Sequence, residues 1–149
     1  GYRLQTAKAF GADAVIHAEE DIPESVRRIN KGRLADIVIV CTGAPAAFHQ
    51  ALKAVDRGGT ILCFATTEPD VELSVPLNEF WRNEIKLMPS YGNSPLDATV
   101  AIELIRSGRV PVGKMITHRL PLDKAGYGFR LVDEGGDSLK VIIEPQRSA

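Results

Sequence analysis

Short apolar runs bounded by turn residues alternate with segments of helical periodicity along most of this chain. The runs at 36–41 and 60–65 are almost wholly apolar in their centres, as strands buried on both faces of a parallel sheet are. Between them, Phe48, Leu52 and Val55 recur at helical spacing. Strands that alternate with helices in this way predict repeated β-α-β units, and therefore an α/β fold with a parallel sheet.

The alternation of predicted strands and helices extends over the rest of the 149 residues. Asp21 and Ser94 each stand just before a proline and a helical pattern, which predicts that both are helix N-caps. The predicted strands are 14–18, 36–41, 60–65, 85–88, 116–120 and 139–143. The predicted helices are 3–10, 23–30, one from 45 to a stop at 57–59, 76–82, one from 95 to a stop at 108, and 123–134.

The net charge limits the kinds of binding partner that the sequence supports, and the two cysteines indicate a cellular compartment. The 18 Lys+Arg residues balance 19 Asp+Glu residues, so the sequence offers no electrostatic case for nucleic acid or for an anionic membrane. No apolar run approaches the ~20 residues that span a bilayer, and the first residues do not resemble a signal peptide. Cys41 and Cys63 lie in apolar runs, which favours buried free thiols in a reducing, cytoplasmic compartment.

Ligands of open parallel sheets bind beyond the carboxyl ends of the strands. Three such ends are predicted here, at 41–43, 64–67 and 89–93, and the first two are rich in small residues. Small residues permit close approach of a ligand to the backbone, but they also suit tight strand-to-helix turns. The pattern therefore leaves both interpretations open.

Motifs of the common chemistries are missing. No G-x-G-x-x-G follows a strand, and the glycines of 125–129 lie inside a helical pattern. His17, His49 and His118 share no metal-ligand spacing with one another or with the cysteines. No G-x-S-x-G is present to support a serine nucleophile. We therefore assign no catalytic residue and no metal ligand to this chain.

Four segments in this order resemble the zinc-type medium-chain alcohol/polyol dehydrogenases, nearest the sorbitol (L-iditol 2-) dehydrogenase and threonine dehydrogenase branches. Each segment alone is only weakly specific for the family, whereas the four segments in this order are quite specific for it. They are "GADAVI" at 11–16, "ADIVIVCTG" at 35–43, "GGTIL" at 58–62 and "ITHRLPL" at 116–122.

The resemblance covers the carboxyl-terminal part of that family. It implies that residues 1–149 are an incomplete Rossmann domain without its first two strands and glycine-rich turn, and that 114–149 return toward a missing catalytic domain. The parent enzyme would use NAD or NADP and a zinc ion held elsewhere to oxidise a small-molecule alcohol or polyol. It would form a homodimer through the strand Ile85–Met88, and this chain alone would be inactive.

The family also implies which residues of this chain would lie near the cofactor. Two of them depart from the family pattern, because Ala65 stands where Gly is usual and Ser90 where the polyol branch often has Arg. Arg3 corresponds to a basic residue near the adenosine ribose or its phosphate. The other implied cofactor-binding residues are Cys41, Thr42, Gly43, Phe64, Ala65, Thr66, Ser90 and Tyr91.

Two alternatives follow from the incomplete pattern. A complete Rossmann sheet has the order 3-2-1-4-5-6, and without strands 1 and 2 we expect 14–18 to pair with 36–41 in the order 3-4-5-6. Exchange with a second chain is the other way to fill the gap. The rival function is a non-enzymatic α/β module that regulates or binds a partner, although no acid after Val40 accompanies Glu19, Glu20 and Asp21 as a signalling receiver would require.

Overall fold

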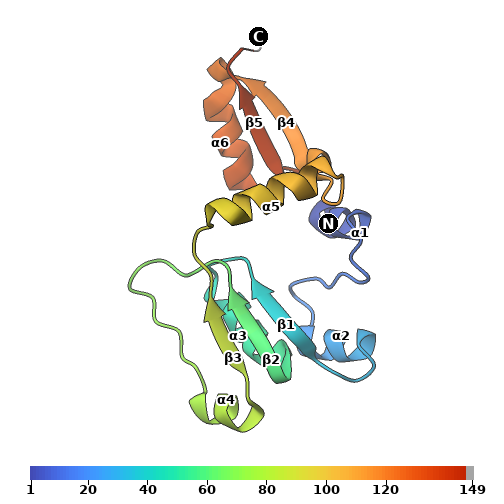
Figure 1. The fold of residues 1–149 in the computed structure, drawn as a ribbon, viewed down its shortest axis with the longest axis vertical. Helices are drawn as coiled ribbons and strands as arrows, with labels where there is room; N and C mark the ends of the chain where they lie inside the picture. Colours follow the sequence, from blue (N-terminus) through green and yellow to red (C-terminus); the bar gives the residue numbers. More distant parts are fainter. Residues whose placement is uncertain (147–149) are drawn as a thin grey trace. The chain divides into compact units, whose positions relative to one another are not determined.

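The computed structural model describes residues 1–146, which form two compact units (Figure 1). One unit is Ile16–Gly92, and the other combines Gly1–Val15 with the chain from Asn93 onward. No helix within the described residues is both long and apolar enough to cross a membrane.

The unit Ile16–Gly92 contains a three-stranded parallel sheet in the order β1-β2-β3, which confirms the predicted α/β class (Figure 1). Its strands are β1 (Ala35–Val40), β2 (Val55–Cys63) and β3 (Lys86–Pro89), and its helices are α2 (Ile22–Ile29), α3 (Pro45–Ala54) and α4 (Leu77–Asn83). Ile39 of β1 is in register with Leu62 of β2, and Leu62 is in register with Met88 of β3.

The core of this unit centres on Ile61, which is fully buried in the middle of β2. The other buried members of the cluster come from β1, α3, α4 and the start of β2, and they are Val40, Ala51, Val55 and Phe80. The side chains of Ile37 and Ile39 are instead 66% and 56% exposed. Because side chains alternate along a strand, β1 buries one face and leaves an apolar face uncovered.

The other unit contains a two-stranded parallel sheet against which helix α6 packs. Helix α6 lies close to the sheet at Gly128, because a Cβ there would lie 3.2–3.3 Å from side-chain atoms of Val141, Ile143 and Leu120. The elements of this unit are α1 (Tyr2–Ala9), α5 (Pro95–Arg106), η1 (Val112–Met115), β4 (Ile116–Pro121), η2 (Leu122–Lys124), α6 (Ala125–Glu134) and β5 (Lys140–Glu144).

Both predicted N-caps are confirmed. The Asp21 carboxylate accepts a hydrogen bond from the Glu24 N–H at 3.0 Å. The Ser94 hydroxyl accepts from the Asp97 N–H at 3.2 Å, and Asp97 in turn accepts from the Ser94 N–H at 2.7 Å. This reciprocal pair is a capping box, which satisfies N–H groups that have no partner inside the helix.

The predicted strand 14–18 and the order 3-4-5-6 are wrong. Residues 14–17 form no strand, and among the described residues β1 pairs with β2 alone. A strand exists only through ladder hydrogen bonds to a neighbour, and the apolar pattern of 14–18 supplies no such partner. Residues 116–120 and 139–143 do form strands, but in a sheet of their own.

Two smaller expectations also need correction. Val55, predicted in the helical stripe, is the first residue of β2, because α3 ends at Ala54 before the 57–59 stop. Cys41, predicted to be buried, is exposed because it follows the last residue of β1, whereas Cys63 at the end of β2 is half-buried.

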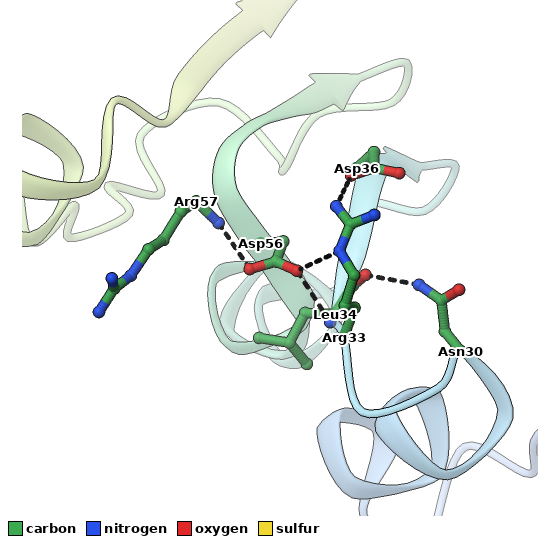
Figure 2. Close-up of polar contacts among 6 residues, drawn as sticks. All are labelled: Asn30, Arg33, Leu34, Asp36, Asp56 and Arg57. Atoms are coloured by element: carbon green, nitrogen blue, oxygen red, sulfur yellow. Dashed lines mark hydrogen bonds and ion pairs between the residues drawn. The ribbon is translucent and has the colours of Figure 1, made fainter.

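The amino ends of β1 and β2 are joined through the carboxylate of Asp56 (Figure 2). It accepts hydrogen bonds from the backbone N–H groups of Arg57 at 2.9 Å and Leu34 at 3.1 Å. The Arg33 guanidinium lies 3.5 Å from Asp56 and also pairs with Asp36. Backbone donation from Arg57, then from Leu34, together with the charge of Arg33, lowers the pKa of Asp56.

We expect Asp56→Asn to make this unit less stable at neutral pH and to flatten its pH dependence. A carboxyl whose pKa is lowered on folding stabilises the native state above its unfolded value of about 3.9, and this stabilisation is lost as the pH falls through the folded value. Urea unfolding at neutral and acidic pH measures the effect. Asp70→Asn, at an exposed position of the same unit, serves as the control, and equal pH dependence in wild type and Asp56→Asn would contradict the assignment.

Candidate functional site

Backbone hydrogen bonds join the loops that follow β1, β2 and β3 at one edge of the sheet. The Val40 carbonyl accepts from the N–H groups of both Phe64 and Ala65, each at 3.0 Å. The Cys63 carbonyl accepts from the Ser90 N–H at 3.0 Å. The predicted carboxyl ends of the three strands are therefore adjacent, as a ligand site of a parallel sheet requires.

Gly43 is the position where two of these loops lie closest. A Cβ at Gly43 would stand 2.5 Å from the carbonyl oxygen of Thr66, a distance that real Cβ atoms do not adopt. The glycine is thus required for packing of protein against protein. The Thr42 hydroxyl accepts from the Ala44 N–H at 3.3 Å and stabilises the turn into α3.

The side chains of this edge are largely open to solvent. Tyr91 is fully exposed, and Phe64 is 65% exposed. Cys41, Thr42 and Ser90 are also exposed, whereas Ala65 is half-buried. A small hollow of about 180 Å³ adjoins Cys41 and Thr42. Exposed backbone groups, hydroxyls and aromatic rings at one edge fit one wall of a binding site for a large polar ligand.

Arg3 stands apart from the other predicted cofactor residues, because it belongs to the unit that contains Gly1–Val15. Its guanidinium donates to the Ser138 carbonyl at 3.0 Å and so ties α1 to the turn before β5. The structure gives Arg3 a structural contact, and its place near a cofactor stays a prediction.

The edge offers binding groups rather than reactive ones. Burial raises the pKa of the Cys63 thiol, which keeps this sulfur protonated and a poor nucleophile. Within residues 1–146 no group of three or more His, Cys, Asp or Glu side chains could hold a metal ion. The described residues therefore do not fit a zinc site, and we derive no step through zinc from them.

Sequence reasoning missed the backbone groups that hold the edge together. The carbonyls of Val40 and Thr66 have no signature in a sequence, because any residue carries them. The glycine in "CTG" was the available signal for a close backbone approach at Gly43. It did not reveal that the neighbouring group is the Thr66 carbonyl.

Comparison with known proteins identifies the family. The profile of the zinc-binding dehydrogenases matches residues 2–107, which is more than half of the chain. The chain belongs to this family. It is 31% identical over 145 residues to sorbitol dehydrogenase of Pongo abelii and 28% identical over 144 residues to L-threonine 3-dehydrogenase of Bacillus licheniformis, with 95% of the chain covered in each case. The predicted resemblance is confirmed.

A solved structure of the family supports the fold. Alcohol dehydrogenase TADH from Thermus sp. ATN1 superposes with a TM-score of 0.84 at 26% identity over 93% of this chain. The chain spans 40% of that structure, 40% of the sorbitol dehydrogenase and 41% of the threonine dehydrogenase. It therefore corresponds to the cofactor-domain part of the zinc-binding dehydrogenases that it matches, with a Rossmann-like arrangement of parallel strands and flanking helices.

Proposed function

We propose that the protein containing this chain is an NAD(P)-dependent, zinc-type dehydrogenase that transfers a hydride from a secondary alcohol or polyol to nicotinamide. The single observation that carries the proposal is the edge where backbone hydrogen bonds join the loops after β1, β2 and β3. This chain supplies one wall of the cofactor site and no catalytic group. Alone, it is inactive.

Zinc and the phosphate-binding turn would come from outside these residues. Zinc polarises the alcohol oxygen as a Lewis acid when it is bound, and the nicotinamide accepts the hydride. The residues of this chain orient the cofactor: Cys41, Thr42 and Gly43 after β1, Phe64, Ala65 and Thr66 after β2, and Ser90 and Tyr91 after β3. Both cysteines are free, which supports a reducing compartment such as the cytoplasm.

Two uncovered surfaces support a larger parent enzyme. Within the described residues, β1 pairs only with β2, so its outer edge presents unpaired backbone groups beside the exposed Ile37 and Ile39. The first strand of the complete Rossmann domain would pair there. In the other unit, Leu122, Phe129 and Val132 are 59–77% exposed. These side chains support the docking of 114–149, of which 147–149 lie outside the described residues, on a catalytic domain.

Isotope-edited NMR of the chain tests the assigned wall directly. Titration with NAD⁺ or NADP⁺ to about 10 mM, well above a millimolar dissociation constant, should shift the amide signals of 41–43, 64–66 and 90–91. Gly43→Ala, which displaces the Thr66 carbonyl, should weaken these shifts, and Gly113→Ala, whose added Cβ meets nothing within 4 Å, should not. Shifts confined to other residues would refute the assignment.

The parent enzyme is proposed to dimerise through the edge of β3. The Ser90 N–H donates to Cys63 of β2, and N–H directions alternate along a strand. The N–H groups of Lys86 and Met88 therefore face β2, and that of Leu87 faces the free edge. Pro89 has no N–H, so Leu87 is the one backbone donor that β3 offers to a second copy.

We expect Leu87→Pro to weaken the dimer by tenfold or more, about 1.4 kcal/mol, by removing that donor. Leu87→Ala is the matched control, because it shortens the side chain and keeps the N–H. Lys86→Pro should instead damage the β2–β3 pairing and the fold. Light scattering against concentration measures the equilibrium, and a wild-type chain that stays monomeric at high concentration would rule out this interface.

A further inference from the structure

A second pocket lies at the opposite end of the three-stranded sheet from the proposed cofactor wall. It is lined where the amino ends of the strands meet α3 and α4, with Leu34 before β1, Val55 at the start of β2 and Ile85 before β3. Its volume is about 730 Å³, within the range of small-molecule sites. The proposed function does not use this pocket.

The floor of the pocket is apolar. Val55 and Phe80 belong to the buried core and are 4% and 8% exposed. Leu34, Leu52 and Ile85 surround them and are half-buried. A flat or branched apolar group that binds here would move from water onto the apolar side chains of the core, and this transfer is favourable.

The rim of the pocket is predominantly cationic. Arg27 of α2, Lys53 of α3 and Arg57 of β2 line it, and none makes an ion pair or a side-chain hydrogen bond with the residues that the structure describes. Asp56 and Glu79 are the carboxylates of the lining, which also includes the imidazole of His49.

Asp56 offsets part of the positive charge of the rim, although its carboxylate oxygens already have other partners. Arg33 and two backbone N–H groups hold its carboxylate. Figure 2 shows the Arg57 guanidinium extending away from Asp56, so that only the Arg57 backbone contacts it. The lining therefore has three cations, Arg27, Lys53 and Arg57, against the two carboxylates of Asp56 and Glu79, and it keeps a net positive charge.

We infer that this pocket binds a small organic phosphate monoester with an apolar body. The apolar part would cover Leu52 and Phe80, and the phosphate would lie among Arg27, Lys53 and Arg57. A dianionic phosphate suits such a rim better than a carboxylate, because it carries more charge and more acceptor oxygens for guanidinium groups. The site is independent of the cofactor wall, so failure of either proposal leaves the other standing.

Phenyl phosphate is the probe, titrated into the isotope-labelled chain at physiological salt. We expect amide shifts around Leu34, Leu52 and Asp56 and a submillimolar dissociation constant. Lys53→Gln and Arg57→Gln should each weaken binding at least fivefold, and Glu79→Gln should strengthen it two- to threefold. Arg82→Gln is the matched control, since Arg82 is an exposed cation on α4 that does not line the pocket. The spectra also report whether each variant is folded.

Two further ligands separate the contribution of the cationic rim from that of the apolar floor. Inorganic phosphate tests the rim without the apolar body, and benzyl alcohol tests the floor without the charge. Both should bind at least tenfold more weakly than phenyl phosphate. Equal binding of either one, unchanged affinity in folded Lys53→Gln and Arg57→Gln, or no shifts up to 10 mM phenyl phosphate would overturn the inference.

Discussion

Replacing Gly59 by alanine is expected to destabilise the unit Ile16–Gly92 by about 3 kcal/mol or to prevent its folding. Gly59 is buried in β2, and an added Cβ would lie 2.7 Å from Val55 Cγ2, 2.8 Å from the Asp56 carbonyl and 3.0 Å from the Asp36 carbonyl. Two of these neighbours are backbone atoms, which cannot rotate away as a side chain can. The strands must separate or β2 must change its path.

The register of the sheet explains why the space is so small. Between the pairs Ala35↔Val55 and Ile37↔Thr60, β1 advances by two residues and β2 by five. The additional residues of β2 fold into a bulge that brings Asp56 over Gly59. A bulge of this kind keeps the Asp56 carboxylate near the start of β1, so Gly59 and the Asp56 hydrogen bonds belong to one local structure.

Gly58→Ala is the matched control for this prediction. Its φ of +72° disfavours alanine, but its added Cβ would meet nothing within 4 Å, so we expect a cost of about 1 kcal/mol. Urea unfolding followed by the fluorescence of Trp81, the single tryptophan and a residue of this unit, measures both variants. Equal costs for the two substitutions would show that the contacts of Gly59 are unimportant.

The elements that the sequence predicted best are those whose pattern reports burial. The centre of β2 is apolar because the core packs around Ile61, and Val38 and Val40 of β1 pack on the same core, whereas Ile37 and Ile39 leave the other face of β1 exposed. The N-caps were visible because a side chain makes the hydrogen bond. Residues 14–18 have the same local pattern as a strand. They failed to form one because strand formation depends on a neighbouring chain segment, which a local pattern does not encode.

The candidate site was predicted in outline and not in its contacts. Topology alone brings the carboxyl ends of neighbouring parallel strands together, so the loops at 41–43 and 64–66 could be placed at one edge. The contact of Gly43 with the Thr66 carbonyl depends on backbone positions in three dimensions. The cationic pocket was missed for the same reason, since Arg27, Lys53 and Arg57 are scattered along the chain and form no motif.

The chain itself is expected to bind NAD⁺ and NADP⁺ no more tightly than about 1 mM, or about −4 kcal/mol. In a dinucleotide fold, the glycine-rich turn and the N-terminus of the helix after it supply the main site for the pyrophosphate. The sequence contains no such turn after a strand. The proposed wall at 41–43, 64–66 and 90–91 would contact the nicotinamide half of the cofactor, but it presents no comparable anion site.

Adding the preceding part of the Rossmann domain should therefore change the affinity more than any substitution within this chain. A longer protein that supplies the glycine-rich turn should bind the cofactor in the micromolar range, about a thousandfold more tightly, or roughly 4 kcal/mol. Calorimetric titration of both proteins measures the difference. Alanine at the central glycine of the added turn should return the longer protein toward millimolar binding, because the backbone could no longer approach the pyrophosphate. Micromolar binding by the present chain alone would mean that the wall after β1, β2 and β3 is a sufficient cofactor site, and the proposed division of the site between the two parts would be wrong.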